Sequence, residues 1–281
     1  MALSVTHKKI RKISEGNNTV HNDLLAVEEP METRLIYYID ELASEKNISV
    51  TMRTPGNDFE LAAGFLFTEG IINCSNDIEQ VGYCKKALAE NNENIVKVKI
   101  KKGASINLNS AERNFYISGS CGVCGKSSID SIKQQSQFSS NFEFKTSLDS
   151  IFKLVPQMKE VQLNFKHTGG IHACALFDAT GKIILVREDI GRHNALDKLI
   201  GNFVLSNQLP INNCILLLSG RISFELVQKA AMAGIGIICG VGAPSSLAVE
   251  TAEKLGITVI GFLKEQSLNI YTHETRILDA N

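Results

Sequence analysis

Hydrophobic positions recur with a clear period through the second half of the chain. Short apolar runs at Cys214–Leu218, Gly236–Gly240 and Ile257–Phe262 predict buried strands. The segments between them, Ser223–Ala233 and Ser246–Leu255, carry apolar residues at helical spacing. This β-α-β-α-β order predicts a largely parallel sheet with right-handed crossovers.

A β-hairpin is predicted upstream of this unit. The apolar segments Ala173–Phe177 and Lys182–Val186 flank Asp178–Gly181, a turn with glycine at its end. Helical spacing of apolar residues also predicts helices over Ser147–Met158 and around Leu196–Phe203.

The first half of the chain has a mixed pattern. Leu35–Ile39, Ile48–Arg53 and Ile95–Ile100 are typical of strands, whereas Asp58–Thr68 has the spacing of a helix. Gly70 follows that helix where a left-handed cap is expected.

Two polar stretches, residues 101–114 and 131–141, lack hydrophobic periodicity and are interpreted as linkers. We therefore expect an α/β protein with an N-terminal α+β domain over residues 1–115. A mobile segment over residues 116–145 would carry the cysteine pair. A C-terminal α/β domain with a mostly parallel sheet would follow over residues 146–281.

Composition excludes several classes of protein. The 29 Lys and Arg against 30 Asp and Glu give a net charge of −1, which argues against a nucleic-acid partner. No apolar run has the length that a bilayer requires, so we expect no membrane association. The start of the sequence has no apolar h-region, and seven cysteines form an odd set with one close pair, so we predict a cytoplasmic protein.

That pair, Cys121 and Cys124, forms a C-x-x-C motif among glycines that give the backbone freedom to move. Ser127 followed by Asp130 resembles a capping box, and so predicts a short helix whose positive end faces Cys124. Lys126 adds a positive charge. Both effects lower a thiol pKa, so the motif favours a nucleophilic thiolate with a second thiol in reach.

Two other interpretations of the motif stay open. A zinc site needs four ligands and this motif supplies two, so zinc would require a second pair from another subunit or distant His and Cys residues, and we expect no metal in the site. A thioredoxin-like redox centre usually follows a strand near the start of a βαβ unit, whereas this pair lies between polar linkers. The other five cysteines lie in apolar surroundings and are predicted to pack as small hydrophobes.

Loops at the carboxyl ends of the predicted parallel strands are candidates for ligand binding. Ser219–Ser223 offers amides, hydroxyls and a guanidinium, and Gly240–Ser246 offers glycines and a capping serine. Together they favour a phosphate-bearing ligand, although ordinary capped turns would have the same sequence. The charged connection Arg187–Ala195 and the segment His167–His172 are either solvated loops or additional walls of that pocket.

Six segments together resemble one family over nearly the whole chain. They are RTPGNDFELAAGFLFTEGII, SGSCGVCGKSSID, KHTGGIHACALFDATGKIILVREDIGRHNALDKLIG, SGRISFELVQKAAMAGI, GAPSSLAVETAEKLGITVIGF and NIYTHETRI. These segments are similar to the formate dehydrogenase accessory sulfurtransferases of the FdhD type.

The resemblance implies a function. A cysteine desulfurase would pass sulfur to Cys121 as a persulfide, with Cys124 as its neighbour in transfer. The acceptor would be the molybdenum cofactor with two pterin-guanine dinucleotides, Mo-bis(molybdopterin guanine dinucleotide), which formate dehydrogenase requires. The family is also expected to form homodimers.

The family's cofactor-binding segment corresponds here to six consecutive residues: Phe262, Leu263, Lys264, Glu265, Gln266 and Ser267. We extend this expected site to Ser219 and Arg221, because the phosphates of a dinucleotide fit the loop after the first parallel strand.

The resemblance further implies a C-terminal domain similar to cytidine deaminases. Those enzymes need a zinc-binding H-x-E or C-x-E at one helix start and P-C-x-x-C at the next. The corresponding connections here, at His193–Ala195 and Ser219–Ser223, lack the Glu and the thiols. Deamination by zinc-bound hydroxide is therefore excluded there.

We thus predict a sulfurtransferase. A rival hypothesis is a non-catalytic cofactor chaperone whose C-x-x-C binds metal or serves docking. A further alternative is dithiol redox chemistry, with a Cys121–Cys124 disulfide that cycles with the client.

Overall fold

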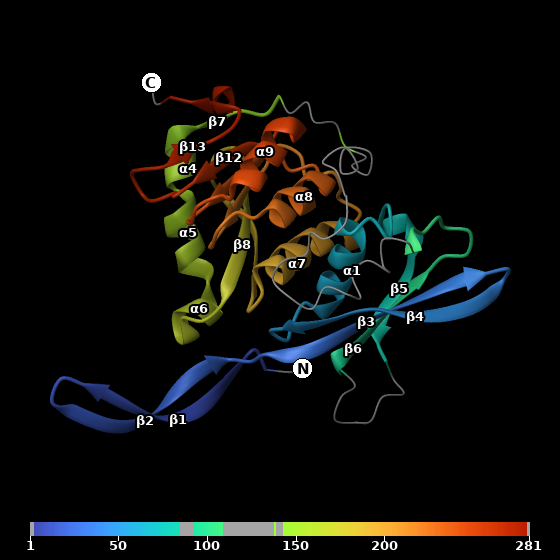
Figure 1. Ribbon diagram of the computed structural model, residues 1–281, viewed down its shortest axis with the longest axis horizontal. Helices are drawn as coiled ribbons and strands as arrows, with labels where there is room; N and C mark the ends of the chain where they lie inside the picture. Colours follow the sequence, from blue (N-terminus) through green and yellow to red (C-terminus); the bar gives the residue numbers. More distant parts are fainter. Residues whose placement is uncertain (1–2, 85–92, 109–137, 139–142, 280–281) are drawn as a thin grey trace.

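The computed structural model describes residues 3–84, 93–108, 138 and 143–279. Its N-terminal half contains a four-stranded sheet in the order β4-β3-β6-β5 (Figure 1). The strands are β3 (Glu29–Ile39), β4 (Leu42–Arg53), β5 (Ile78–Tyr83) and β6 (Ile95–Ile100). The three strands expected in this half are confirmed.

Helix α1 (Asp58–Thr68) has the bounds that its pattern predicts. Its start is fixed by Arg53, whose fully buried guanidinium donates to Asp58 over 3.1 Å and 3.0 Å. Gly70 has a φ of 67°, so the expected left-handed residue after the helix is confirmed.

A six-stranded sheet with the order β13-β12-β11-β10-β8-β9 forms the second half. Its strands are β8 (His172–Phe177), β9 (Ile183–Asp189), β10 (Ile215–Leu218), β11 (Ile237–Gly240), β12 (Thr258–Gly261) and β13 (Asn269–Ile270). The strands β10, β11 and β12 are parallel as predicted, but the other three pairings of this sheet are antiparallel. The expectation of a mostly parallel sheet is therefore wrong. The tight turn after β8 forces β9 to run back beside it, and β8 itself pairs with β10 in the antiparallel sense.

Helices cover both faces of this sheet. The helices α7 (Arg192–Leu205), α8 (Phe224–Met232) and α9 (Ser246–Leu255) pack on one face, together with α1. The other face is covered by α5 (Leu154–Val161) and its neighbour α4 (Leu148–Phe152), whose buried side chains meet Ala173, Ala175 and Phe177. Alternate residues of β8 thus face two separate cores, as a two-sided sheet requires.

The single helix expected over Ser147–Met158 is instead two helices, α4 and α5, separated at Lys153. The reason is Pro156, which has no N–H to donate to the carbonyl of Phe152 and whose ring crowds that group. The amphipathic spacing continued across the break, so periodicity alone did not reveal it.

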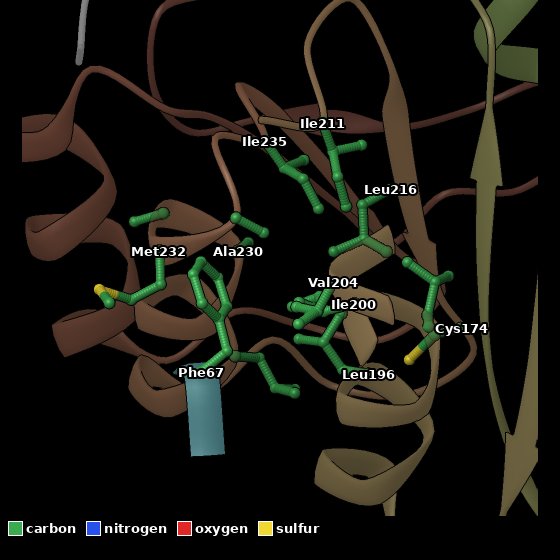
Figure 2. Packing of buried hydrophobic residues seen from close by; sticks show 14 of the residues in the cluster. Phe67, Cys174, Leu196, Ile200, Val204, Ile211, Leu216, Ala230, Met232 and Ile235 are labelled. Atoms are coloured by element: carbon green, nitrogen blue, oxygen red, sulfur yellow. The ribbon is translucent and has the colours of Figure 1, made fainter. Parts of the chain in front are cut away.

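The two halves share one core. Buried residues from both belong to the same cluster, and Figure 2 shows Phe67 of α1 in it with residues of α7 and α8. The helices α1 and α7 cross at Gly64 and Gly201. A Cβ on Gly64 would lie 2.9 Å from the backbone nitrogen of Gly201, so only glycines permit this approach. The domain bounds expected from the sequence stay a prediction.

A buried ionic network reinforces the crossing. Lys229 of α8 donates to Thr68, Glu69 and Asp197 over 2.8, 2.8 and 3.0 Å. Thr68 donates in turn to Asp197 of α7 over 2.8 Å. The charges are therefore satisfied, as burial demands.

A two-stranded arm was not expected. It consists of β1 (Val5–Ser14) and β2 (Asn17–Ala26) and projects from the body (Figure 1). Remaining short elements are β7 (Thr146–Ser147), β14 (Ile277–Leu278), α6 (Leu163–Thr168) and 3₁₀ turns at Ser75–Asp77 and Glu274–Arg276. Among the described residues, no helix is long and apolar enough to cross a membrane.

Candidate functional site

Three loops meet where the parallel strands β10, β11 and β12 end. Backbone hydrogen bonds join them: Gly242 donates to Gly220 over 3.0 Å, and Leu263 donates to Gly240 over 3.0 Å. Phe262 donates to Gly242 over 3.1 Å and has a φ of 52°, which is uncommon for a bulky side chain. The loops therefore form one rigid rim, as the predicted strand order requires.

A cavity of about 950 Å³ opens beside this rim. Six of the eight residues expected at the cofactor site line it, namely Ser219, Leu263, Lys264, Glu265, Gln266 and Ser267. The other two, Arg221 and Phe262, lie outside its lining. The remaining walls are Val155, Met158, Lys159, Gln162, Phe165, Gly169, Gly170, Ile171, His172, Ile190 and Val241. Its size is at the upper end of the range of about 300–1,000 Å³ for small-molecule sites.

Ser219 is held in place from both sides. Its hydroxyl accepts a hydrogen bond from the N–H of Ala173 over 2.9 Å, and its own N–H donates to the Ala173 carbonyl over 3.0 Å. The loop after β10 is thus tied to the antiparallel neighbour β8. The hydroxyl proton of Ser219 remains free to donate to a ligand.

The charged groups at the cavity are two lysines and one glutamate. Lys159 of α5 and Glu265 face one another at 3.9 Å, and both side chains are largely exposed. Lys264 lies in a turn closed by its N–H, which donates to Ser267 over 2.8 Å. The balance is one positive charge, which suits an anionic ligand. Because the Lys159–Glu265 pair is exposed, its contribution to stability is small.

His172 of β8 lines the cavity and is a titratable group there. Burial lowers its pKa from the usual range, and the positive charge of Arg192 lowers it further. The imidazole is therefore neutral at pH 7, with one donor and one acceptor nitrogen. The polar segment His167–His172 signalled this wall in the sequence, but the sequence did not decide between a solvated loop and a pocket.

The charged connection between β9 and α7 proves to be mainly a junction between the two halves. Asp189 and Lys198 form a fully buried pair at 2.7 Å. Asp189 accepts from the N–H of Thr54 over 3.2 Å, and Lys198 donates to the Thr54 carbonyl over 2.7 Å. Of this connection, Ile190 reaches the cavity.

The starts of α7 and α8 bring His193 and Ser223 together at 3.3 Å, with Glu225 4.0 Å from the same imidazole nitrogen. Burial, with the charge of Arg192 next, lowers the pKa of His193 to about 4. No group of three metal-binding side chains occurs in the described part of the chain. The likeness to cytidine deaminases stays a prediction.

The cysteine pair Cys121 and Cys124 lies outside the described residues. Of the other cysteines, Cys84, Cys174 and Cys239 are buried. Burial raises the thiol pKa of Cys174 and Cys239 well above its usual range, so both are protonated at neutral pH. The predicted core packing is therefore confirmed for Cys84, Cys174 and Cys239, whereas Cys74 and Cys214 are only partly buried.

Comparison with known proteins identifies the family of the chain. Residues 31–278 match the model of the FdhD/NarQ family. The chain belongs to the FdhD/NarQ family. The family assignment made from the sequence segments is therefore confirmed.

Curated members of the FdhD/NarQ family align over nearly the full length. The sulfur carrier protein FdhD of Mycolicibacterium paratuberculosis is 42% identical over 97% of this chain and 98% of its own. The sulfur carrier protein FdhD of Sulfurisphaera tokodaii is 40% identical over 98% of this chain and 100% of its own.

The fold also matches a solved structure. A crystal structure described as that of a formate dehydrogenase accessory protein from Desulfotalea psychrophila superimposes with a TM-score of 0.75. The two chains are 23% identical, and the match covers 98% of this chain and 100% of the other. The likeness shows that the two proteins share a fold.

Proposed function

We propose that this protein is a sulfur carrier whose client is formate dehydrogenase, and that it acts as a sulfurtransferase. Membership of the FdhD/NarQ family supports the carrier role, as do relatives named sulfur carrier proteins. The accessory protein of similar fold supports the client. Cys121 would accept sulfur from a cysteine desulfurase and deliver it to the molybdenum cofactor with two pterin-guanine dinucleotides.

The cavity is the observation that carries this proposal. It brings Ser219, in the loop after a parallel strand, together with Leu263–Ser267, which corresponds to the family's cofactor-binding segment. Its apolar walls suit a flat heterocycle, and Lys159 and Lys264 suit phosphates. A nucleotide-sized part of the cofactor, which is here the substrate, is thus compatible with the residues present.

The loading step requires a thiolate. The Cys121 thiolate attacks the outer sulfur of the donor's persulfide, the donor's S–S bond breaks, and the donor cysteine leaves as a thiolate. Cys121 then carries the persulfide with its proton, and no external oxidant or reductant is consumed. The raised thiol pKa values of Cys174 and Cys239 disfavour these residues as carriers.

The rival hypothesis is a chaperone that carries the cofactor without sulfur chemistry. The test is activation of purified, cofactor-deficient formate dehydrogenase by the wild type, Cys121→Ala and Cys124→Ala. Loss of activation by Cys121→Ala with cofactor binding retained is expected for transfer. Full activation by Cys121→Ala would establish the chaperone instead.

The cavity itself is tested with guanosine diphosphate as a probe. Gly170 lines the cavity, and a Cβ on it would meet only the Thr168 carbonyl, at 3.8 Å, so Gly170→Leu adds bulk at the cavity wall without displacing the backbone. We expect calorimetric binding of the probe by the wild type and at least tenfold weaker binding by this variant. The matched control is Gly82→Leu, because a Cβ on Gly82 has no atom within 4 Å. Equal binding of guanosine diphosphate by the wild type and both variants would show that the cavity is not the nucleotide-binding site.

A further inference from the structure

The amino-terminal arm, residues 5–26, is an isolated two-stranded ribbon. Its strands pair in register from Val5 with Ala26 to Ser14 with Asn17. Every residue from 11 to 22 is exposed. A lone two-stranded ribbon is at best marginally stable in water. A ribbon with ten residues in each strand therefore indicates a surface that another molecule covers.

One face of the arm combines cations with apolar side chains. Side chains alternate along a strand, and opposite residues of a pair share a face, so Lys9, Arg11 and Ile13 lie on one side. Val20 pairs with Arg11 and joins them. Ile13 is 76% exposed and Val20 is 60% exposed, and the two are diagonal neighbours in the register, so they form one small exposed apolar patch.

The arm's charge is concentrated on β1. The strand carries four cations and no acid: Lys8, Lys9, Arg11 and Lys12. None of the four forms an ion pair with a residue in the described part of the chain. In contrast, Lys97, Lys99 and Lys102 of the body each pair with a glutamate within 2.9 Å. The arm's two acids are Glu15 at its tip and Asp23, which lies opposite Lys8, so the arm as a whole offers a net charge of +2 to an external partner.

The base of the arm lies beside the cavity. Ser4 donates to Asn164 of α6 over 3.1 Å, and the N–H of Val27 donates to Ser4 over 2.9 Å, which closes the ribbon against that helix. Phe165, the next residue of α6, is a wall of the cavity. A molecule that covers the arm from its tip to its base would therefore reach the cavity mouth.

We propose that the arm is a docking element that binds an acidic, partly apolar surface of the client protein. The cations would attract acidic groups, while Ile13 and Val20 would be covered by apolar ones. Nucleic acid fits less well, because the arm has no Phe, Tyr or Trp to stack on bases and the chain as a whole carries a charge of −1. This inference rests on the proposed function only for the identity of the client, formate dehydrogenase.

The probe is the cofactor-deficient formate dehydrogenase of the same organism, with binding measured by biolayer interferometry at two salt concentrations. One variant changes Lys8, Lys9, Arg11 and Lys12 to Gln, and a second changes Ile13 and Val20 to Ser. The charge-matched control changes four exposed body lysines to Gln: Lys101, Lys145, Lys182 and Lys254. The apolar control is Leu42→Ser at another hairpin tip, where Leu42 is 73% exposed.

We expect both arm variants to bind the client at least tenfold more weakly, and both controls to bind as the wild type does. The wild type should lose affinity as salt rises, and the arm-charge variant should lose this dependence. Loading of Cys121 and binding of guanosine diphosphate should be unchanged in the arm variants, which separates this proposal from the proposed function. Equal binding by arm variants and wild type overturns the proposal, as does absent binding by the wild type. An arm-dependent affinity for DNA, or an arm-dependent oligomer that does not bind the client, also overturns it.

Discussion

Replacing Gly201 with alanine tests the close crossing of α1 and α7. A Cβ on Gly201 would lie 2.6 Å from the carbonyl carbon of Glu60 and 2.8 Å from the backbone nitrogen of Gly64. Carbon atoms in good contact are about 3.5–4.0 Å apart. The carbonyl oxygen of Glu60 would lie closer still, so the helices would have to separate by more than about 1 Å. Both are buried in the shared core, so neighbouring side chains would have to move as well.

The expected change in unfolding free energy on Gly201→Ala follows from two opposing effects. Overpacking of a core costs about 1–3 kcal/mol, and here backbone rather than a flexible side chain must move. Alanine favours a helix over glycine by about 1 kcal/mol. Because the separation also strains the contact of Asp197 with Lys229, we expect a net loss of about 2 kcal/mol. At roughly 2–4 °C per kcal/mol, Tm should fall by about 4–8 °C.

The assay is thermal unfolding followed by circular dichroism and calorimetry. The control is Gly82→Ala in β5, where a Cβ has no atom within 4 Å. The control should be as stable as the wild type or slightly more stable. A Gly201→Ala protein as stable as the control would show that α1 and α7 do not approach closely enough to exclude a Cβ at Gly201.

Three further results are expected. Lys229→Met leaves Asp197 buried without its cation and should cost about 3–5 kcal/mol in urea unfolding; a loss below about 1 kcal/mol would mean that the pair is not buried as described. His193 should titrate near pH 4 by NMR; since this pKa lies below the unfolded value of about 6.5, stability should fall as the pH drops from 6.5 towards 4, whereas an NMR midpoint above 6 would contradict the burial of the ring. Ser245→Ala removes the hydroxyl that accepts from the N–H of Ala248 over 3.2 Å at the start of α9, which should lower unfolding free energy by about 1 kcal/mol; an unchanged value would show that the cap contributes nothing.

Local pattern was enough to predict much of the fold. The helix over Ser246–Leu255 and the strands around it have short-range periodicity and turn residues, which depend little on distant contacts. The rim of the cavity followed from one rule, that parallel strands end at the same edge of a sheet. Ser219 and the segment Leu263–Ser267 therefore meet as expected.

The remaining features depend on contacts between distant segments. Lys159 and His172 reach the cavity from a helix on the opposite face and from an antiparallel strand, and no local signal fixes either placement. The Asp189–Lys198 pair and its bonds to Thr54 join the two halves, so the charged segment could not be distinguished from a solvated loop. The arm has no apolar face towards the body, so its alternation gave no signal of a half-buried strand.

The most direct test of the sulfurtransferase account is mass spectrometry of the Cys121–Cys124 peptide. The protein is incubated with a cysteine desulfurase and cysteine, beside Cys121→Ala and Cys124→Ala. If Cys121 carries a persulfide, the wild-type peptide gains one sulfur atom that a reductant removes and that is absent from Cys121→Ala. An unmodified peptide, or one that carries zinc or a stable disulfide instead, would contradict it.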